Sequence, residues 1–453
     1  MGLCASKPYY RIVLLGNVGS GKTTFCKQVV DSYLGGFSPS MRQEFRKHIQ
    51  ANILHRLVSL LSFEEIQDEI AASDSLGKNY SLLENAVVAD FDYTDDESMT
   101  YVQDVLDAAI FVGESPVMEG VVKSMFLTAP WDFMYFKSIR RIMKKDYQPS
   151  KEDIFMCRKP TTGHCEYIIK HLHVDGKKKK EILIEIIDVG GQQSERKAWE
   201  KQIELADAIL YMMSMTDYAG RERKTSNDYY SYLSDDNICN LKHTQELFRE
   251  SFLIPKTRYI PVVLLETKVD LFRKMIEENA PAMSEIFPDY TGPEENYEAA
   301  AIFLRKKITE SLKSGCSRKH LLKSKLDRMP ILRQNLTNTE NFKSGFSKIW
   351  SKMVDTMDDM SILERQKGRK SSMQTFMHEK KRLLKHHRQS LSMNGRQLTP
   401  SSFRQSIGIF PRKSGQIASI EELISGTNHL SKETDSRKES VEGIVRSKSY
   451  HWN

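Results

Sequence analysis

The feature that most constrains the fold is a glycine-rich loop near the start of the sequence, placed between a strand-like run and a helical pattern. Residues 10–16 are rich in leucine and β-branched residues and end in glycine, which is typical of a buried parallel strand. Residues 16–23 follow with the pattern G-x-x-x-x-G-K-T, and a helical pattern runs from Thr23 to about Tyr33. This order of strand, loop and helix predicts an α/β domain with a phosphate-binding loop.

The residue types in this loop suit a nucleotide phosphate and its magnesium ion. Glycines allow backbone N–H groups to close around phosphate oxygens, Lys22 neutralises the terminal phosphates, and the Thr23 hydroxyl can coordinate Mg²⁺. The alternative, a glycine-rich turn with a chance lysine, is disfavoured by the strand and helix on either side. The predicted phosphate-binding residues are Gly16, Gly19, Ser20, Gly21, Lys22, Thr23 and Thr24.

Strand-like runs return after a long helical stretch. Residues 40–147 have apolar positions spaced for helices, and no run among them is convincing as a strand. A hairpin is predicted at residues 166–174 and 181–187, joined by a turn made of Asp175, Gly176 and four lysines. The later strand-like runs are residues 208–214, 259–265 and about 330–332. We therefore expect a mostly parallel sheet with helices on both faces, a ligand at the carboxyl ends of its strands, and an inserted all-helical block.

A second motif completes the predicted phosphate site. Asp188 ends the apolar run 182–187, where nucleotide-binding sites hold Mg²⁺ through water with a carboxylate from a second strand. Gly191 lets a backbone N–H approach the γ-phosphate, and Gln192 can orient the attacking water. A glycine turn at a strand end would explain this motif alone, but its occurrence together with the glycine-rich loop favours a nucleotide-hydrolysing site.

Two longer segments resemble the switch regions of heterotrimeric G-protein α subunits. These segments are residues 146–163, DYQPSKEDIFMCRKPTTG, and residues 188–199, DVGGQQSERKAW. Further agreement lies in Lys27-Gln28 and at residues 36–38, 267–272 and 297–300, so that the resemblance covers roughly residues 10–356. It implies a Ras-like P-loop GTPase domain with a mostly parallel sheet and an inserted all-helical domain. It also implies a signalling switch that cycles between GDP and GTP and hydrolyses GTP with Mg²⁺.

The resemblance assigns roles to residues of the hydrolytic site. It makes Arg158 a built-in arginine finger, which offsets the charge that develops on the transferred phosphoryl group. It makes Thr161 the second protein ligand of Mg²⁺, beside Thr23. The alternative for Arg158 is a solvated surface arginine, which its spacing to Thr161 disfavours.

The resemblance also implies which residues read the base. Thr267, Lys268 and Asp270 follow the strand-like run 260–265 and resemble the guanine-reading motif, with Thr267 where many family members have asparagine. The Asp270 carboxylate can accept from guanine N1–H and the 2-amino group, donors that adenine does not present in that arrangement. The aliphatic stem of Lys268 would cover the base.

Two further positions depart from the family pattern. Leu336 lies in the second base-contacting loop, residues 334–337, where the family has a small residue. The contact is made through a backbone N–H, so leucine can serve, but its bulk is expected to loosen the base pocket and speed nucleotide exchange. Gln193 replaces an arginine that helps lock the second switch in its GTP-bound form, so that switch is expected to be less firmly held.

Composition separates the end of the chain from the rest. Residues 361–453 hold 18 Lys and Arg against 8 Asp and Glu, a net charge of +10, whereas the whole chain carries +7. Few large apolar residues occur there, so we expect a disordered, basic, serine-rich tail. The remainder is slightly acidic, which argues against nucleic acid as a partner. The expected domains are residues 1–9 (lipidated segment), 10–36 and 158–360 (GTPase domain), 37–157 (helical domain) and 361–453 (tail).

The first residues fit a lipidation pattern. Gly2 is the expected acceptor of a myristoyl group, and Cys4 is the expected acceptor of a palmitoyl group. One myristoyl chain gives only reversible membrane binding, so palmitoylation or the basic tail would be needed for stable attachment. Neither a run of eighteen apolar residues nor a secretory signal is visible. We therefore expect the cytoplasmic face of the plasma membrane, with GTP or GDP bound and with receptor and effector proteins as possible partners.

The same end of the chain leads to an expectation about the βγ dimer. Family members normally carry a helix of roughly seven turns before the first strand, and this helix makes much of the contact with βγ. Here only Met1 to Tyr9 precede the strand, and Pro8 disfavours even a short helix. We expect βγ binding to be weak or absent.

Two other functions agree with the motifs. A lipid-anchored GTPase of the ADP-ribosylation-factor type also uses the sequence DVGGQ, but such a protein lacks the arginine-bearing segment and the long helical insert. A non-hydrolysing scaffold could bind nucleotide through a loosened base pocket, although Arg158 and Gln192 favour hydrolysis.

Overall fold

One six-stranded sheet, with strand order β2-β3-β1-β4-β5-β6, organises the fold. β2 is antiparallel to β3 and the other neighbouring strands are parallel, which confirms the predicted mostly parallel sheet. The computed structural model describes residues 9–61, 64–88, 99–119, 135–159, 161, 163–175, 178–191, 199–219, 241–254, 257, 260–278, 282–311 and 329–366. The strands are β1 (Tyr9–Leu15), β2 (His164–Asp175), β3 (Lys178–Val189), β4 (Ala208–Ser214), β5 (Val262–Thr267) and β6 (Ile331–Arg333).

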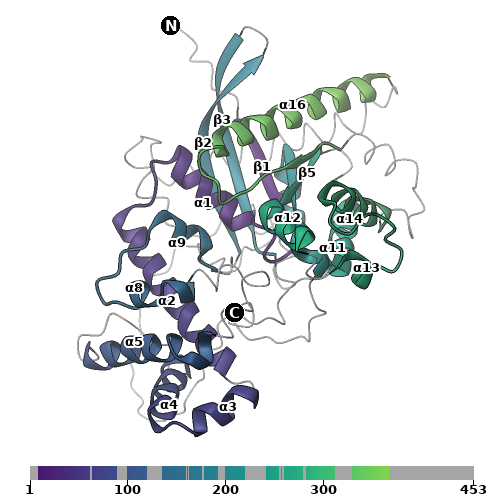
Figure 1. Cartoon of the computed structure of the whole chain (residues 1–453). Helices are drawn as coiled ribbons and strands as arrows, with labels where there is room; N and C mark the ends of the chain where they lie inside the picture. The colour runs from purple at the N-terminus through teal and green to yellow at the C-terminus, as the bar shows by residue number, and fades with distance from the viewer. Residues whose placement is uncertain are drawn as a thin grey trace, which may run out of the picture. The chain divides into compact units, whose positions relative to one another are not determined.

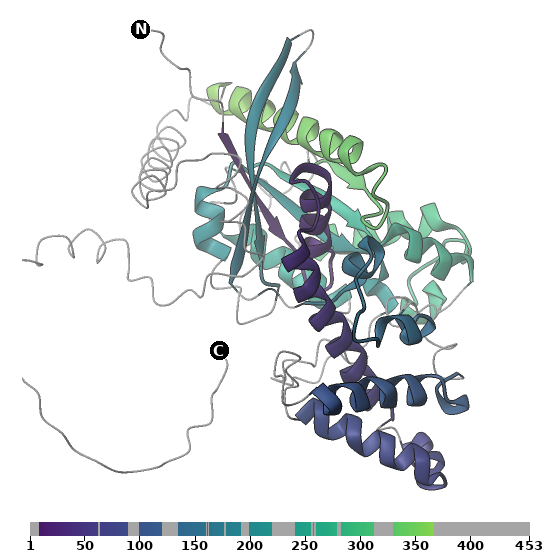
Figure 2. The same cartoon turned by 90° about the vertical axis from the view of Figure 1, so that its left-hand side faces the viewer.

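The hairpin of β2 and β3 is longer than the sequence predicts, because three of the four lysines belong to a strand and not to the turn. Lys178 pairs with Asp175, and Lys180 pairs with His173. Lysine is a poor strand former in isolation, but strand propensity depends strongly on cross-strand partners, and here pairing continues along both strands. Figure 2 shows this hairpin extending beyond the rest of the sheet.

Helices cover both faces of the sheet. They are α1 (Lys22–Tyr33), α10 (Trp199–Leu205), α11 (Leu241–Leu253), α12 (Val269–Glu277), α14 (Tyr297–Ser311) and α16 (Phe342–Gln366), with the short η3 (Met215–Ala219) and α13 (Met283–Ile286). Ile12 and Leu14 of β1 belong to one buried cluster with residues of α1 and α16. Val13 and Leu15 belong to a second cluster with residues of α10, α11, α12 and α14. This period of two is expected of a strand buried on both faces, and it places α1 and α16 on one side (Figure 1).

A group of helices interrupts the α/β part between α1 and β2. These helices are α2 (Pro39–Leu61), α3 (Glu64–Ala71), α4 (Asp74–Val88), α5 (Met99–Gly113), α8 (Ile139–Ile142) and α9 (Lys151–Met156). The apolar residues Ile49, Ile53 and Leu57 of α2, whose spacing is that of one helical face, are all buried. Within the described part of residues 39–156 every regular element is a helix, as the sequence predicts.

Side chains of α1 and of the segment that follows it join this helical group to the α/β part. The Phe37 ring lies 5.7 Å from that of Phe45 and 6.0 Å from that of Phe155, measured between centroids. Lys27 of α1 lies 5.3 Å from the centroid of Phe45 and donates a hydrogen bond to the Cys157 carbonyl. Burial lowers the pKa of this lysine. One buried cluster therefore continues from β1 through α1 into the inserted helices.

The last described helix is longer than expected. α16 continues to Gln366, so the first residues assigned to the basic tail are helical, and the boundary at residue 360 lies inside a helix. Residues 1–8, with Gly2 and Cys4, and residues 367–453 lie outside the described residues. No helix in the described ranges has both the length and the apolar character needed to cross a bilayer.

Asp153 organises the chain just before the arginine-bearing segment. Its carboxylate accepts hydrogen bonds from both terminal nitrogens of Arg141, at 2.8 and 2.7 Å, and from the Tyr147 hydroxyl at 2.8 Å. The backbone N–H of Ser150 also donates to it at 2.9 Å, while the Ser150 hydroxyl accepts from the Asp153 N–H in a capping box that begins α9. Burial opposes ionisation, but these hydrogen bonds hold the pKa of Asp153 below its ordinary value.

We expect Asp153→Asn to lower the free energy of unfolding by roughly 2 kcal/mol near pH 7, because a neutral amide replaces a charged hydrogen-bond acceptor. A lowered carboxyl pKa means that the stabilisation is present above the unfolded-state pKa and is lost as the pH falls. The variant and the wild type should therefore converge in acid. Urea unfolding followed by circular dichroism measures both effects. Glu152→Gln, at an exposed position of the same helix, is the control, and equal stability of the two variants at pH 7 would contradict this role of Asp153.

Candidate functional site

The glycine-rich loop joins the end of β1 to the start of α1. Lys22 is buried, and its Nζ donates to the carbonyls of Gly16 and Asn17, both at 2.8 Å. The N-cap of α1, Gly21, has φ 96° and provides no side-chain cap, so backbone N–H groups of the first turn remain for an anion. An ammonium group and a helix N-terminus therefore converge where the sequence predicts phosphate. Gly19, Ser20, Thr23 and Thr24 lie in this loop and the first turn of α1.

Three oxygen-bearing side chains from separate segments converge beside this loop. The Thr23 hydroxyl lies 3.0 Å from Asp188 Oδ2 and 3.0 Å from the Thr161 hydroxyl, which is 3.4 Å from the same carboxylate oxygen. The Oδ1 atom of Asp188 is buried and accepts no hydrogen bond from the described residues. Burial raises the pKa of Asp188, against the lowering effect of the charge on Lys22. A buried carboxylate oxygen in this position suits a cation.

The donor set fits magnesium in particular. Hydroxyl and carboxylate oxygens are the hard ligands that Mg²⁺ takes, and Mg²⁺ commonly binds through one or two protein groups together with substrate phosphates and water. Within the described ranges, no group of three or more His, Cys, Asp or Glu side chains forms a site that could hold a metal by itself. Thr23, Thr161 and Asp188 therefore match an ion that arrives with its nucleotide.

The end of β3 and the start of β2 close the other side of this arrangement. The Gly190 N–H donates to the Gly163 carbonyl at 3.1 Å, which keeps the Thr161 segment beside the DVGG turn. A Cβ atom at Gly191 would lie 2.8 Å from Lys22 Nζ and 3.0 Å from the backbone nitrogen of Val18. Only glycine allows this turn to approach the phosphate loop so closely. Gln192 and Gln193 lie outside the described residues.

Two polar side chains from different helices hold the backbone of the arginine-bearing segment. Lys27 of α1 donates to the Cys157 carbonyl, and Asn52 of α2 donates to the Arg158 carbonyl at 2.8 Å. Arg158 itself is partly buried. The resemblance points to Lys27 through the pair Lys27-Gln28, but the contribution of Asn52 is not visible in the sequence, because it depends on how α2 packs.

The residues predicted to read the base come to the same edge of the sheet. The Thr267 hydroxyl donates to the Ser20 carbonyl at 2.8 Å and approaches the Met213 carbonyl at 3.2 Å, which ties the end of β5 to the phosphate loop. Lys268 follows with φ 54°, the left-handed conformation, and caps α12. Asp270 lies in the first turn of α12, and no described residue donates a hydrogen bond to its carboxylate.

Leu336 packs into the site with its side chain turned toward the phosphate loop. Its side chain is buried, and Cδ1 would lie only 2.9 Å from a Cβ atom built at Gly21. Its carbonyl accepts a hydrogen bond from Gln28 Nε2 at 2.7 Å. The leucine thus joins the second base loop to α1. The expected effect of its bulk on the base pocket and on exchange stays a prediction.

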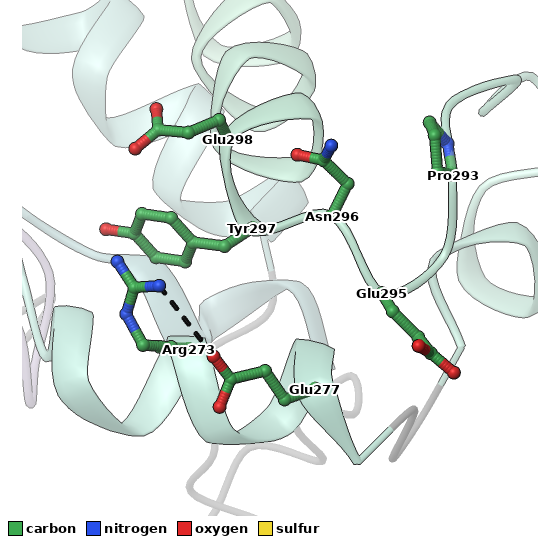
Figure 3. A pocket seen from close by; sticks show the side chains of 7 residues that line it. All are labelled: Arg273, Glu277, Pro293, Glu295, Asn296, Tyr297 and Glu298. Carbon is green, nitrogen blue, oxygen red and sulfur yellow. Dashed lines mark ion pairs between the residues drawn. The ribbon is translucent and has the colours of Figure 1, made fainter.

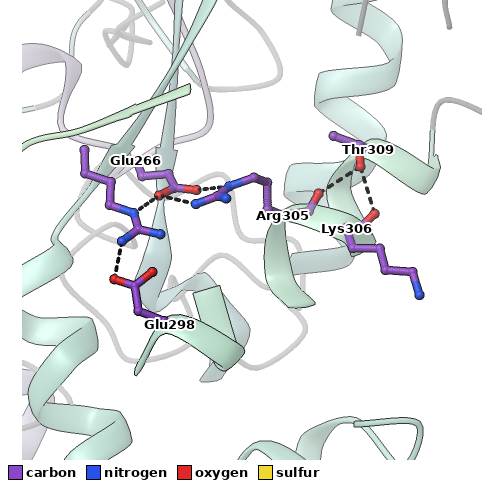
Figure 4. Close-up of polar contacts among 6 residues, drawn as sticks. Glu266, Glu298, Arg305, Lys306 and Thr309 are labelled. Carbon is purple, nitrogen blue, oxygen red and sulfur yellow. Dashed lines mark hydrogen bonds and ion pairs between the residues drawn. The ribbon is translucent and has the colours of Figure 1, made fainter. Parts of the chain in front are cut away.

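Glu266, which the sequence does not single out, is a buried carboxylate directly before Thr267, the first of the residues predicted to read the base. It is completely buried in β5, and Arg305 of α14 binds both carboxylate oxygens, at 2.7 and 3.1 Å. Arg333 of β6 donates to Oε2 at 2.8 Å and pairs with Glu298 through a second nitrogen. Figure 4 shows Glu266 facing Arg305, with Glu298 close by. The only signal in the sequence is a glutamate directly after the apolar run 260–265.

A surface cavity of about 450 Å³ borders this ion-pair network, because Glu298 is among its lining residues. Within it, Arg273 lies 4.2 Å from the Tyr297 ring centroid and 3.7 Å from the Glu277 carboxylate. None of the residues predicted to bind nucleotide lines it (Figure 3). The lining residues are Arg273, Glu277, Pro293, Glu295, Asn296, Tyr297 and Glu298.

The sequence of this chain is similar to the sequences of known proteins. A family model described as G-protein alpha subunit matches residues 5–354, a range that contains every site residue described above. The chain is also similar to the guanine nucleotide-binding protein G(o) subunit alpha of Geodia cydonium. The two are 26% identical over 306 residues, which cover 66% of this chain and 78% of the relative.

We expect Glu266→Gln to lower the free energy of unfolding by roughly 2–3 kcal/mol, because two guanidinium groups lose a buried counter-charge. The change should also speed GDP release, since Glu266 directly precedes Thr267. Urea unfolding and release of a fluorescent GDP analogue measure these effects. Glu298→Gln is the matched control, because Glu298 is 60% exposed and an exposed ion pair contributes below about 1 kcal/mol. Identical GDP release from both variants would exclude a role for Glu266 in holding the base-reading loop.

Proposed function

Because this chain belongs to the G-protein α-subunit family, a family of guanine-nucleotide-binding signal transducers and GTPases, we propose that it cleaves GTP with Mg²⁺ and an arginine supplied in cis. The matched range includes both the helical insert and the arginine-bearing segment, which places the chain with the α subunits and not with GTPases of the ADP-ribosylation-factor type. The residues proposed for the reaction lie between Gly16 and Leu336.

The observation that carries the proposal is the convergence of Thr23, Thr161 and Asp188 beside Lys22. The Thr23 and Thr161 hydroxyls would hold Mg²⁺ directly and Asp188 would hold it through water; the bound ion would neutralise charge on the β- and γ-phosphate oxygens. Lys22 would exchange its two carbonyl partners for phosphate oxygens, and the N–H groups at the start of α1 would bind the same phosphates. The Asp188 oxygen that accepts no hydrogen bond supports a cation at this place.

Two groups are proposed to act on the reacting atoms. Arg158 would stabilise charge on the transferred phosphoryl group, and Gln192 would orient the attacking water. Support for Arg158 comes from its neighbourhood, because Lys27 and Asn52 bind the backbone carbonyls of Cys157 and Arg158, one on each side of the Arg158 Cα atom. Support for Gln192 is its place directly after Gly191, whose turn packs against Lys22.

Guanine is the proposed base, and Asp270 is the proposed discriminating residue. Its carboxylate would accept from N1–H and the 2-amino group, while an adenine base would leave it without donors. Lys268 would lie along the base plane and the Leu336 N–H would contact its edge. Thr267 replaces asparagine in the motif and contacts the phosphate loop through its hydroxyl, which supports a structural role for this position.

The proposed location is the cytoplasmic face of the plasma membrane, reached through acylation of Gly2 and Cys4. Its support is the pattern of the first residues, because two acyl chains give stable attachment where one gives reversible binding. Receptor and effector proteins are proposed as partners on the ground of family membership.

Single-turnover hydrolysis tests the proposed chemistry. Arg158→Cys and Gln192→Leu should each retain GTP binding but slow phosphate release on the order of 10³-fold, because both groups act mainly in the transition state. Arg140→Cys, at an exposed arginine paired with Glu114, should keep the wild-type rate. ATP should not be cleaved by any of them. Wild-type turnover in both site variants would remove the proposed mechanism, and GTP binding without hydrolysis by the wild type would favour a scaffold.

Base selection is a separate prediction. Asp270→Asn should weaken GTP binding and shift preference toward xanthine nucleotides, because an amide can donate where the carboxylate could only accept. Competition of GTP and XTP for a fluorescent guanine nucleotide measures the shift. Glu277→Gln, at an exposed position of the same helix, provides the control. An unchanged order of affinities in Asp270→Asn would show that another residue reads the base.

A further inference from the structure

A chain of buried polar side chains leads from the phosphate loop into α11 and η3. Asn17 Nδ2 donates to the Thr244 hydroxyl at 3.1 Å, and this hydroxyl donates to Asp217 Oδ2 at 2.7 Å. His243 Nδ1 lies 3.5 Å from the same Asn17 nitrogen. Asn17 belongs to the phosphate loop, Thr244 to α11 and Asp217 to η3, and all three are buried. None of them is among the residues that the sequence predicts to bind nucleotide.

The charge of Asp217 gives this chain of hydrogen bonds a fixed direction. Burial raises the pKa of Asp217 to about 6, while the charge of Lys268 and the hydrogen bond from Thr244 oppose the rise, so that the group is ionised at neutral pH. A carboxylate only accepts hydrogen bonds, so the Thr244 hydroxyl donates its single hydrogen to Asp217 and accepts from Asn17. The Asn17 amide must then turn Nδ2 toward Thr244, which leaves Oδ1 for a donor on its other side.

That donor belongs to the next peptide group of the phosphate loop. The Val18 N–H donates to Asn17 Oδ1 at 2.9 Å. The carbonyl of the same peptide, that of Asn17, accepts from Lys22 Nζ at 2.8 Å and from the Ser20 N–H at 3.2 Å. Both polar groups of the peptide between Asn17 and Val18 are therefore bonded, and the Asn17 side chain fixes the orientation of its N–H.

The peptide between Asn17 and Val18 packs against the DVGG turn. A Cβ atom at Gly191 would lie 3.0 Å from the Val18 nitrogen and 3.1 Å from the Asn17 carbonyl carbon. Gln192, which is proposed to orient the attacking water, directly follows Gly191 in the sequence. A rotation of this peptide would therefore change how closely the DVGG turn, and Gln192 after it, can approach the phosphate loop.

We propose that Asn17 is a positioning residue for GTP hydrolysis, and that Thr244 and Asp217 hold it in the orientation that lets the DVGG turn approach the phosphate loop. This rests on the proposed GTPase function. Asn17 would act through the peptide that it orients, without touching the reacting atoms. Because the DVGG turn is proposed to contact the γ-phosphate, which GDP lacks, the GTP form should depend on Asn17 more than the GDP form does. α11 and η3 would thereby influence hydrolysis.

The test measures single-turnover hydrolysis by the full chain, and its affinities for GDP and for a non-hydrolysable GTP analogue. Asn17→Ala should slow hydrolysis about 10-fold, the order expected when buried hydrogen-bonding groups lose their partner, and should weaken analogue binding more than GDP binding. Thr244→Val removes the hydroxyl and should act alike, whereas Thr244→Ser keeps it and should stay within about twofold of the wild type. The double variant Asn17→Ala/Thr244→Val should be no slower than either single variant, because both changes break the same chain of hydrogen bonds.

The matched control removes another buried hydroxyl of α11. Ser251 donates to the Leu247 carbonyl within the helix, so Ser251→Ala should hydrolyse GTP at the wild-type rate. Wild-type hydrolysis by Asn17→Ala and Thr244→Val, a loss in Thr244→Ser as large as that in Thr244→Val, or equal losses of GDP and analogue affinity would overturn the proposal. If the wild type bound GTP without cleaving it, the proposed GTPase function would fail, and the ratio of the two affinities would still decide the role of Asn17.

Discussion

The nucleotide end of the molecule depends on how closely the end of β1 approaches β4. A Cβ atom at Gly16 would lie 2.3 Å from the Met212 carbonyl, so any other residue would push the two strands apart. With glycine, the chain turns at once into the phosphate loop, and Lys22 returns to bond the carbonyls of Gly16 and Asn17. Ser20 is then near enough to β5 for its carbonyl to accept from Thr267. The phosphate and base ends of the site are in this way connected through one tight turn.

The second organising feature is a shared core between the helical insert and the α/β part. Phe37, Phe45 and Phe155 continue the cluster that starts under the sheet, and Lys27 crosses the same region to reach Cys157. Burying a charged ammonium group costs free energy unless the charge is paired or the group loses its proton. The lowered pKa of Lys27 agrees with this cost. The insert therefore contributes packing and hydrogen bonds to the segment that carries Arg158, in addition to its own helices.

Much of the fold was predictable because the decisive signals are local. The predicted strand at residues 208–214 coincides with β4. The phosphate-binding loop from Gly16 to Thr23 could be predicted from its residue types and their spacing alone. Lysines 178–180 were assigned to a turn but belong to β3, because their strand conformation depends on pairing with β2. The end of α16 was placed too early, because the helix continues to Gln366 although the apolar pattern stops before that residue. Glu266 could not be assigned from sequence, because its burial depends on two arginines that are 39 and 67 residues away along the chain. Asn52 was missed for the same reason.

The two hydrogen bonds to the Cys157 and Arg158 carbonyls have a consequence for the order of events in a nucleotide cycle. One donor belongs to α1, beside the sheet, and the other belongs to α2, in the helical group. Any rearrangement that separates α2 from α1 must break at least one of them and leave the proposed arginine finger less well held. A molecule that is open enough to exchange its nucleotide would therefore hydrolyse GTP slowly. Newly bound GTP would be cleaved only after the chain had closed around it. Exchange and cleavage would then follow one another in time, because the two hydrogen bonds that hold the Arg158 segment form only when α1 and α2 are together.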